Sequence, residues 1–117
     1  MSVQHVLSVV AVGDLPTAAA WYERLLGRSP DNRPMSSLAE WQVVPGGWVQ
    51  VFADAERAGR SQLNLAVDDL DAHRAELVAR GLAPGEVREA SRGVRLCPLH
   101  DPDGNAVTLI GGFRVDY

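Results

Sequence analysis

Apolar and polar positions along the chain follow the same order twice. The run Val6–Val12 is mostly apolar on both of its alternating faces, and a stretch with helical spacing of apolar residues follows it over 14–27. Gln62–Val67 is a second extended run, and a second helical stretch follows it over 69–81. Self-similarity of this kind indicates two copies of one structural unit in the chain.

Both helical stretches begin and end with residues that are typical of helix termini. Asp14 and Asp69 are good N-caps, because an aspartate side chain accepts hydrogen bonds from the first backbone N–H groups of a helix. Gly27 and Gly81 are typical stops at the carboxyl end. In the first helix the apolar stripe consists of Leu15, Ala18, Ala19, Tyr22, Leu25 and Leu26.

Three further segments in each half have the composition of strands and turns. In the first half they are 28–37, read as an irregular edge strand or loop, then 38–44 and 48–52; in the second half they are 86–89, 93–99 and 105–113. The motif Asp101-Pro102-Asp103-Gly104-Asn105 precedes the last of these segments. It lacks the later glutamate of a calcium-binding loop, so we interpret it as a turn.

Each half is therefore predicted to be a βαβββ module, and the chain to be an α+β protein of two tandem modules. Residues 1–53 form the first module, 54–60 a polar linker, and 61–117 the second module. A helix covers one face of each sheet, while the other face is partly apolar and needs a partner. We expect the two uncovered faces to line a cleft that binds a ligand.

Composition narrows the classes of function. The chain has 117 residues, of which 46% are hydrophobic, enough for the core of a single domain. Its net charge of −4 argues against nucleic acid or a membrane surface as a partner. Cys97 is the only cysteine and is expected to be buried, so no disulfide forms within the chain. No apolar stretch approaches the roughly 20 residues of a membrane span, and we expect a cytoplasmic protein.

Several segments resemble the vicinal oxygen chelate superfamily, which includes glyoxalase I, extradiol dioxygenases, and fosfomycin and bleomycin resistance proteins. The matching stretches are 12–15 and 21–27 in the first half and 65–72 and 101–105 in the second. The resemblance covers nearly the whole chain and implies a fold of two βαβββ modules whose mixed sheets form a cleft. Because one fold hosts many functions, the activity has to be argued from the site.

The resemblance also implies where a metal ion would bind. Metal-dependent enzymes of the superfamily hold a divalent ion with His, Glu or Gln side chains from matching strands of the two halves. The corresponding positions in this sequence are Leu7, Gln50, Gln62 and Thr108. Leucine cannot bind a cation, and neutral amides and a hydroxyl do not replace carboxylates and imidazoles. We therefore expect no metal and no cofactor, with His5, His100 and Glu40 as candidates outside this set.

The cleft is expected to combine apolar and hydrogen-bonding side chains. Gln62 and Asn64 alternate on an otherwise apolar strand and are expected to face a wet cavity, or else a sheet edge or a dimer contact. Trp41 and Trp48 offer flat apolar surface to an aromatic ligand, with packing in the core or in a dimer interface as the alternative. Arg95 binds an anionic group or forms a structural ion pair. The predicted set is Leu7, Val9, Trp41, Trp48, Gln50, Gln62, Asn64, Arg95 and Thr108.

Three functions are consistent with these residues. The leading hypothesis is a metal-independent homodimer that binds or sequesters a small apolar or aromatic molecule, such as a drug or toxin, as bleomycin-type members of the superfamily do. The second is a lyase, isomerase or dioxygenase, with or without a metal, whose activity depends on His5, His100 or Glu40. The third is a non-catalytic regulatory or vestigial module whose cleft is closed and dry.

Overall fold

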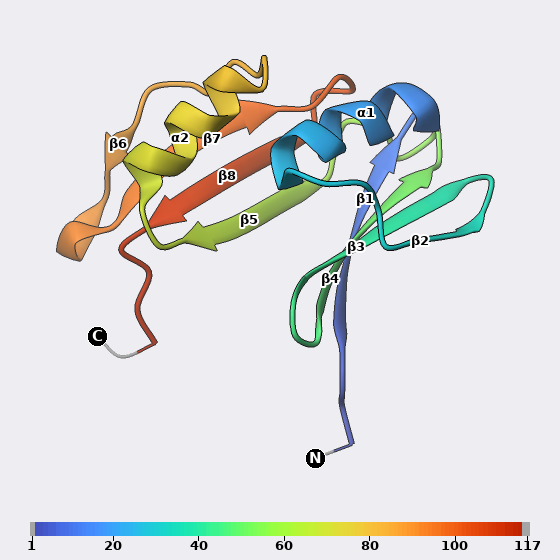
Figure 1. Cartoon of the computed structure of the whole chain (residues 1–117), viewed down its shortest axis with the longest axis horizontal. Helices are drawn as coiled ribbons and strands as arrows, with labels where there is room; N and C mark the ends of the chain where they lie inside the picture. Colours follow the sequence, from blue (N-terminus) through green and yellow to red (C-terminus); the bar gives the residue numbers. More distant parts are fainter. Residues whose placement is uncertain (1, 116–117) are drawn as a thin grey trace.

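The computed structural model describes residues 2–115 as two four-stranded sheets, each with one helix packed against it (Figure 1). The first half contains β1 (Val6–Val12), α1 (Leu15–Leu26), β2 (Asn32–Met35), β3 (Leu38–Val44) and β4 (Gly47–Ala53). The second half contains β5 (Gln62–Val67), α2 (Leu70–Ala79), β6 (Arg88–Glu89), a 3-10 turn at Ser91–Gly93, β7 (Arg95–His100) and β8 (Ala106–Gly111). The predicted α+β class and the βαβββ order of both halves are confirmed.

The helix termini follow from local sequence. The side chain of Asp14 accepts a hydrogen bond from the backbone N–H of Thr17, and that of Asp69 accepts one from Ala72. Gly27 ends α1 in the left-handed conformation with φ 80°, which glycine adopts without a steric penalty. Within residues 2–115, no helix is long and apolar enough to cross a membrane.

The two sheets have the same strand arrangement. Sheet A has the order β1-β4-β3-β2 and sheet B the order β5-β8-β7-β6. In each sheet the first strand pairs in parallel with the last strand of its module, and the remaining neighbours are antiparallel. The register is also repeated, because Val9 lies beside Gln50 in sheet A and Asn64 beside Thr108 in sheet B. The two halves are therefore copies of one module in both topology and register.

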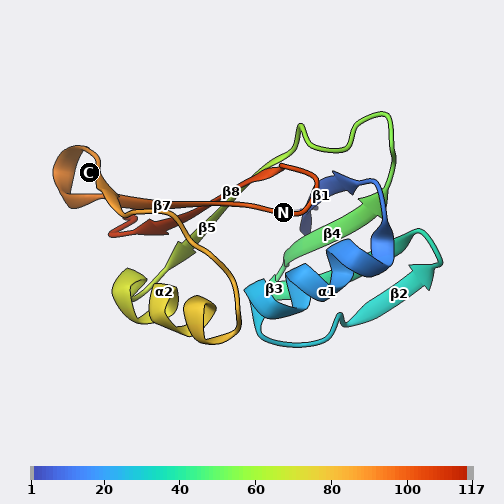
Figure 2. The same cartoon turned by 90° about the horizontal axis from the view of Figure 1, so that it is seen from above.

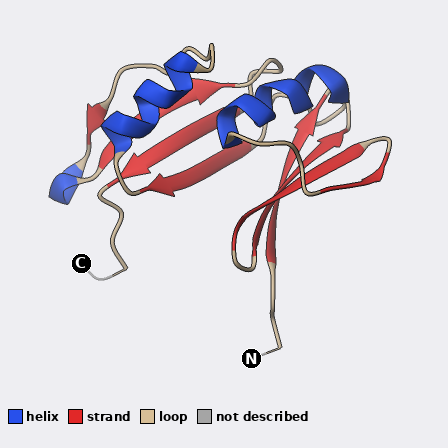
Figure 3. Cartoon of the chain, in the orientation of Figure 1, coloured by secondary structure: helices blue, strands red, loops and turns tan. Residues whose placement is uncertain are grey.

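Each helix covers one face of its sheet and leaves the other face uncovered (Figure 3). The covered faces hold the core, in which alternate strand residues are buried: Val10, Val12, Ala39, Trp41, Val49 and Val51 in sheet A, and Leu63, Cys97, Leu99, Val107 and Leu109 in sheet B. The predicted burial of Cys97 is confirmed. Figure 2 shows both helices on one side of the sheets, and the linker between β4 and β5 on the other.

A buried carboxylate joins the two modules. Asp101 accepts hydrogen bonds from the Tyr22 hydroxyl and from the Asn105 side chain, each at 2.8 Å, and from two backbone N–H groups of its own turn. Asn105 donates to the Ala11 carbonyl at 2.8 Å and accepts from the Ser61 backbone N–H at 2.8 Å. Tyr22 and Ala11 belong to the first module. The motif interpreted as a turn therefore also connects the modules.

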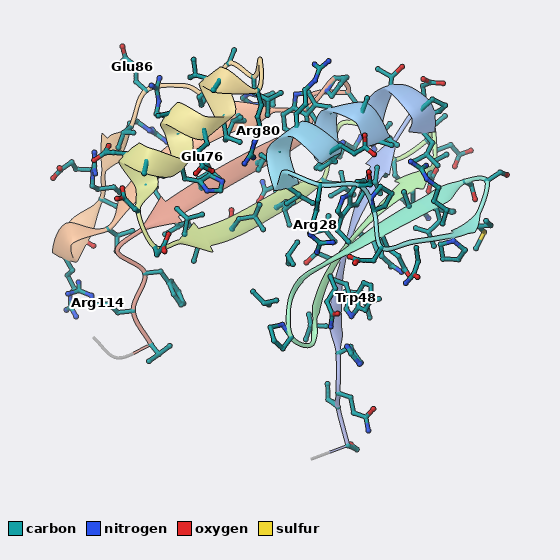
Figure 4. The ribbon with its side chains drawn as sticks, viewed as in Figure 1. Arg28, Trp48, Glu76, Arg80, Glu86 and Arg114 are labelled. Carbon is teal, nitrogen blue, oxygen red and sulfur yellow. The ribbon has the colours of Figure 1, made fainter. Side chains whose placement is uncertain are left out.

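A second link between the modules lies at the ends of the helices. Arg80 follows α2, and its guanidinium donates to the carbonyl of Arg24 at 3.1 Å, in the last turn of α1. Figure 4 shows Arg80 between the two helices. A cation at this position satisfies free carbonyls and interacts favourably with the helix dipole. Glu76 holds Arg80 in place through an ion pair at 3.2 Å.

Two strand boundaries in the second module differ from the prediction. The strand predicted to begin at Gly93 begins at Arg95, because Arg92 and Gly93 adopt positive φ values of 59° and 78° inside the 3-10 turn. The last strand ends at Gly111 because Gly112 has φ 75°. A residue with positive φ cannot continue an extended strand. Of the segment 28–37, which was predicted to be an irregular edge strand or a loop, Asn32–Met35 forms the edge strand β2.

Candidate ligand-binding face

Strand alternation places one set of side chains on the uncovered side of sheet A, which we call the open face of sheet A. On this face Leu7 lies beside Trp48, and Val9 lies beside Gln50, which is next to Glu40 on β3. Leu7 and Val9 are 48% and 55% exposed. Trp48 lies near the N-terminal part of β1 (Figure 4). This face is therefore apolar along β1 and polar between β3 and β4.

The polar groups of this face hydrogen-bond to one another. Glu40 accepts a hydrogen bond from the Gln50 side chain at 2.8 Å and one from the Asn32 side chain at 3.1 Å. The indole N–H of Trp48 donates to Nδ1 of His5 at 2.9 Å. Gln50 has a carbonyl oxygen besides the amide nitrogen that Glu40 uses, so the face presents both a carboxylate and an amide to a ligand.

The corresponding face of sheet B, its open face, is more polar. Gln62 and Asn64 are exposed and alternate with Leu63, which is buried against the helix side. Thr108 lies beside Asn64 in the register and is half-buried. His100 is exposed at the end of β7. The two amides lie outside the dry core, and their contact with a ligand remains a prediction.

Trp41 does not lie on the open face, which corrects its predicted place in the cleft. It is fully buried, its ring packs near Tyr22 at 6.4 Å between centroids, and its indole N–H donates to the carbonyl of Arg28 at 2.9 Å. The reason is the register of the β3–β4 hairpin, in which Trp41 lies beside Val49 and points toward α1. Trp48 pairs with a neighbouring position of β3 and has the opposite orientation.

Arg95 also lies away from the open faces. It pairs with Gly111 on the helix side of sheet B, and its two terminal nitrogens contact the two oxygens of Asp71 in α2, each at 3.0 Å. Hydrogen bonding and the charge of Arg95 lower the pKa of the Asp71 carboxyl. Of the two roles considered for Arg95, the structure shows the ion pair.

A pocket of about 610 Å³ opens on the face of sheet A. Its floor is formed by Val9, Ala11 and Phe52, and its wall by Asp54, Arg57, Arg60 and Ser61. The linker, together with Ser61 that follows it, thus provides the wall next to sheet A. Ala11 and Phe52 lie two residues after Val9 and Gln50 on the same strands, so strand alternation puts them on the same face. The two arginines were missed, because no periodic pattern places a linker side chain.

The donors at the four positions implied by the resemblance do not fit a divalent transition metal. Leu7 has no donor atom, the Gln50 amide nitrogen is bound to Glu40, and Gln62 and Thr108 offer neutral oxygens only. Across residues 2–115 there is no group of three His, Cys, Asp or Glu side chains that could hold a metal ion.

A second pocket, of about 440 Å³, lies where the modules meet on the helix side. It is lined mainly by apolar residues, with Arg28, Asn64 and His73 as its polar members. Arg28 is engaged with Asp31 at 2.9 Å and with the carbonyl of Gln42. Asn64 is therefore the predicted site residue that reaches both this pocket and the open face of sheet B.

The fold defines a protein of two tandem βαβββ modules, each with one sheet face that its helix leaves uncovered. The chain matches the family described as Glyoxalase-like domain over residues 8–110. It belongs to this family, and the resemblance to the vicinal oxygen chelate superfamily is confirmed. No curated protein matches the sequence significantly.

Solved structures show the same architecture. A glyoxalase/bleomycin resistance protein from Catenulispora acidiphila is 33% identical, with 92% of this chain and 97% of that chain covered and a TM-score of 0.87. TnmS3, an antibiotic-binding protein from a Streptomyces species, is 24% identical over 95% and 98% of the chains, with a TM-score of 0.75. A lactoylglutathione lyase from Agrobacterium tumefaciens is 17% identical over 92% of both chains, with a TM-score of 0.77. The last two support the fold alone.

Proposed function

We propose that this protein is a metal-independent binder of a small apolar or aromatic molecule, and that the ligand lies on the open face of sheet A. The observation that carries the proposal is the pairing of Leu7 with Trp48 and of Val9 with Gln50 on one uncovered face. Exposed apolar groups next to a few polar ones are typical of ligand sites. Because the donors suit no transition metal, binding rather than metal catalysis accounts best for this face.

Two comparisons support the same proposal. The structure from Catenulispora acidiphila is named a glyoxalase/bleomycin resistance protein, and TnmS3 is named an antibiotic-binding protein. By analogy with these proteins, we propose that this chain sequesters a drug or toxin, so that binding alone lowers the free concentration of the compound. Such a role requires affinity and no turnover.

We further propose a homodimer, in which a second copy covers the exposed edge of β1. Within residues 2–115, β1 and β5 are edge strands with one hydrogen-bonded neighbour each. Val6 is 66% exposed, and the N-terminal part of β1 projects away from sheet B (Figure 1). An apolar edge strand that is left uncovered favours association between chains. The second copy would bring its own open face against this one and close the cleft.

Ligand binding is tested by titrating planar aromatic compounds while following tryptophan fluorescence. Trp48 lies on the face, whereas Trp41 is buried, so Trp48→Phe should remove most of the ligand-induced change. Gln50→Leu should weaken ligands that need a hydrogen bond and spare purely apolar ones. Val78→Ala, which changes an exposed apolar residue on α2, is the matched control. Equal responses of Val78→Ala and Trp48→Phe would contradict a site on this face.

The oligomeric state is tested by native mass spectrometry with and without added Zn²⁺. We expect a dimer mass, unchanged by the metal, and a shift toward monomer in Val6→Asp, because a charge at the covered edge must be desolvated. Met35→Asp, at an exposed apolar position on the edge strand β2, is the control. A wild-type monomer at micromolar concentration would contradict the dimer.

One observation favours an enzyme as the second candidate. Glu40 is a carboxylate on the open face, oriented by Gln50 and Asn32, and an oriented carboxylate is a common general base. If a compound that binds is also converted, Glu40→Gln should abolish conversion and leave binding nearly unchanged. Conversion that persists in this variant would exclude Glu40 as the base.

A further inference from the structure

The linker brings positive charge to a pocket of an acidic chain. The pocket on sheet A is walled by Arg57 and Arg60, with Asp54 as its one carboxylate. Asp54 lies 2.7 Å from Arg57, and this hydrogen bond lowers the pKa of the Asp54 carboxyl. Arg60 forms no hydrogen bond or ion pair within residues 2–115, so its guanidinium is available to a ligand. The pocket therefore carries one uncompensated positive charge, whereas the chain as a whole has a net charge of −4.

The linker is held in place at several points. The backbone N–H of Asp54 donates to the Val12 carbonyl at 2.9 Å, and the Ser61 hydroxyl accepts from the Ala11 N–H at 3.0 Å. Between them, Gly59 has φ 89° and approaches the backbone of Asp103 so closely that a Cβ there would lie 2.7 Å from its carbonyl oxygen. These contacts fix the backbone on either side of the arginines and hold them over the pocket.

The floor and the wall of the pocket select for different parts of one molecule. The floor, made of Val9, Ala11 and Phe52, suits a hydrocarbon or aromatic group, which loses contact with water when it binds. A guanidinium pairs with the two oxygens of a carboxylate or with the oxygens of a phosphate or sulfonate. A molecule with one apolar part and one anionic group matches both.

We propose that Arg60 makes this pocket selective for small, mostly apolar molecules that carry a single anionic group. The inference rests on the proposed function, because it assumes that the open face of sheet A binds a ligand. The inference specifies the charge of the ligand, which the residues predicted from the sequence to form the site do not determine. The Arg57–Asp54 pair serves as a fixed neighbour that keeps the wall polar without adding net charge.

The test uses two fluorescent probes that differ only in charge. 8-Anilinonaphthalene-1-sulfonate carries a sulfonate on the ring system of N-phenyl-1-naphthylamine, which is neutral. Both probes are titrated into the purified full-length protein. We expect the anionic probe to bind more tightly than the neutral one. Arg60→Gln should weaken the anionic probe by about 3- to 10-fold, the range of a partly exposed charged hydrogen bond, and change the neutral probe by less than about twofold. Increasing salt should weaken the anionic probe in wild type and have little effect in Arg60→Gln.

The control variant is Arg88→Gln, which removes the same charge from the exposed strand β6 of sheet B. Equal weakening of the anionic probe by Arg88→Gln and Arg60→Gln would overturn the proposal, since the effect would then reflect net charge alone. Competition by 1-naphthoate, naphthyl phosphate and 1-naphthamide separates the anionic groups: displacement by the first two and not by the amide supports the proposal, and equal displacement by the amide overturns it.

Failure of the inference is distinguishable from failure of the proposed function. If the neutral probe binds and Val9→Ser weakens it, while the sulfonate gives no advantage, the open face binds ligands and only the charge selectivity is wrong. If neither probe binds the wild-type protein, both the proposed binding function and the proposed charge selectivity are contradicted.

Discussion

The two modules share topology and register but differ in the chemistry of their open faces. Toward the helices, Trp41 and Leu99 occupy equivalent positions, and both are buried apolar residues. On the open faces, Val9 of sheet A corresponds to Asn64 of sheet B, and Gln50 to Thr108. The buried helix-facing positions of the strands stay apolar in both copies because a dry core tolerates little else. The open faces are free of this constraint, so ligand recognition is expected to be unequal between the modules.

The largest expected effect separates the two faces of sheet A. Trp41→Ala should lower the free energy of unfolding by about 3–5 kcal/mol, because it leaves a cavity under α1. Trp48→Ala should lower it by less than about 1 kcal/mol, since Trp48 is on the open face. Urea denaturation of both variants measures the difference. Similar losses would mean that the open face of sheet A is packed as a core, as in a closed and dry module.

The link between the modules gives the next effect. Asn105→Ala should lower the free energy of unfolding by about 1–3 kcal/mol, because the Ala11 carbonyl and the Ser61 N–H lose their buried partner. Asn32→Ala, which removes an exposed hydrogen bond to Glu40, should cost about 0.5 kcal/mol or less. Thermal or urea unfolding of the pair measures the comparison. Equal losses would show that the turn has no special role at the junction.

The same junction predicts a pH dependence. Burial, followed by the charge of Asp101 and the hydrogen bond to it, raises the pKa of the Tyr22 phenol well above its ordinary value. The folded state keeps the proton while the unfolded chain releases it near pH 10, so this stabilisation is full below about pH 10 and is lost as the pH rises further. Unfolding free energies measured from pH 8 to pH 11 should therefore fall above about pH 10.

Tyr22→Phe should flatten that fall, because phenylalanine has no proton to release. Tyr117 lies outside the described residues and is replaced by phenylalanine in both proteins, so that Tyr22 is the only tyrosine compared. A fall of equal slope with and without the Tyr22 hydroxyl would show that another group causes it.

The smallest expected effect concerns metal. Addition of Zn²⁺ or Ni²⁺ should leave the midpoint of thermal unfolding unchanged within error, because the four implied positions offer no carboxylate or imidazole. An ion present at a hundredfold excess over its dissociation constant would stabilise the folded state by about 2.7 kcal/mol and raise the midpoint by several degrees. Such a rise would contradict the metal-independent proposal and favour the enzyme.

Local patterns were sufficient to predict most elements. Asp14 and Gly27 delimit α1 as predicted, because capping depends on side chains and backbone within one turn of helix. Trp41 was predicted wrongly to share a face with Trp48, because the face depends on how β3 pairs with β4, and there Trp41 lies beside Val49 instead of Trp48. A one-residue change of register reverses the face of a side chain. The linker arginines were missed because their position depends on contacts with the distant turn at Asp103.

The sequence by itself determined the repeat, the order of elements in each module and the capping of the helices. These depend on residue chemistry and on spacing along the chain, which need no long-range contact. Only the tertiary structure decided that Asp101 and Asn105 join the modules, that Arg95 pairs with Asp71, and that Arg60 lines the same pocket as Val9 and Phe52. Each of these depends on residues from different elements of the chain, which become neighbours only when the elements pack together.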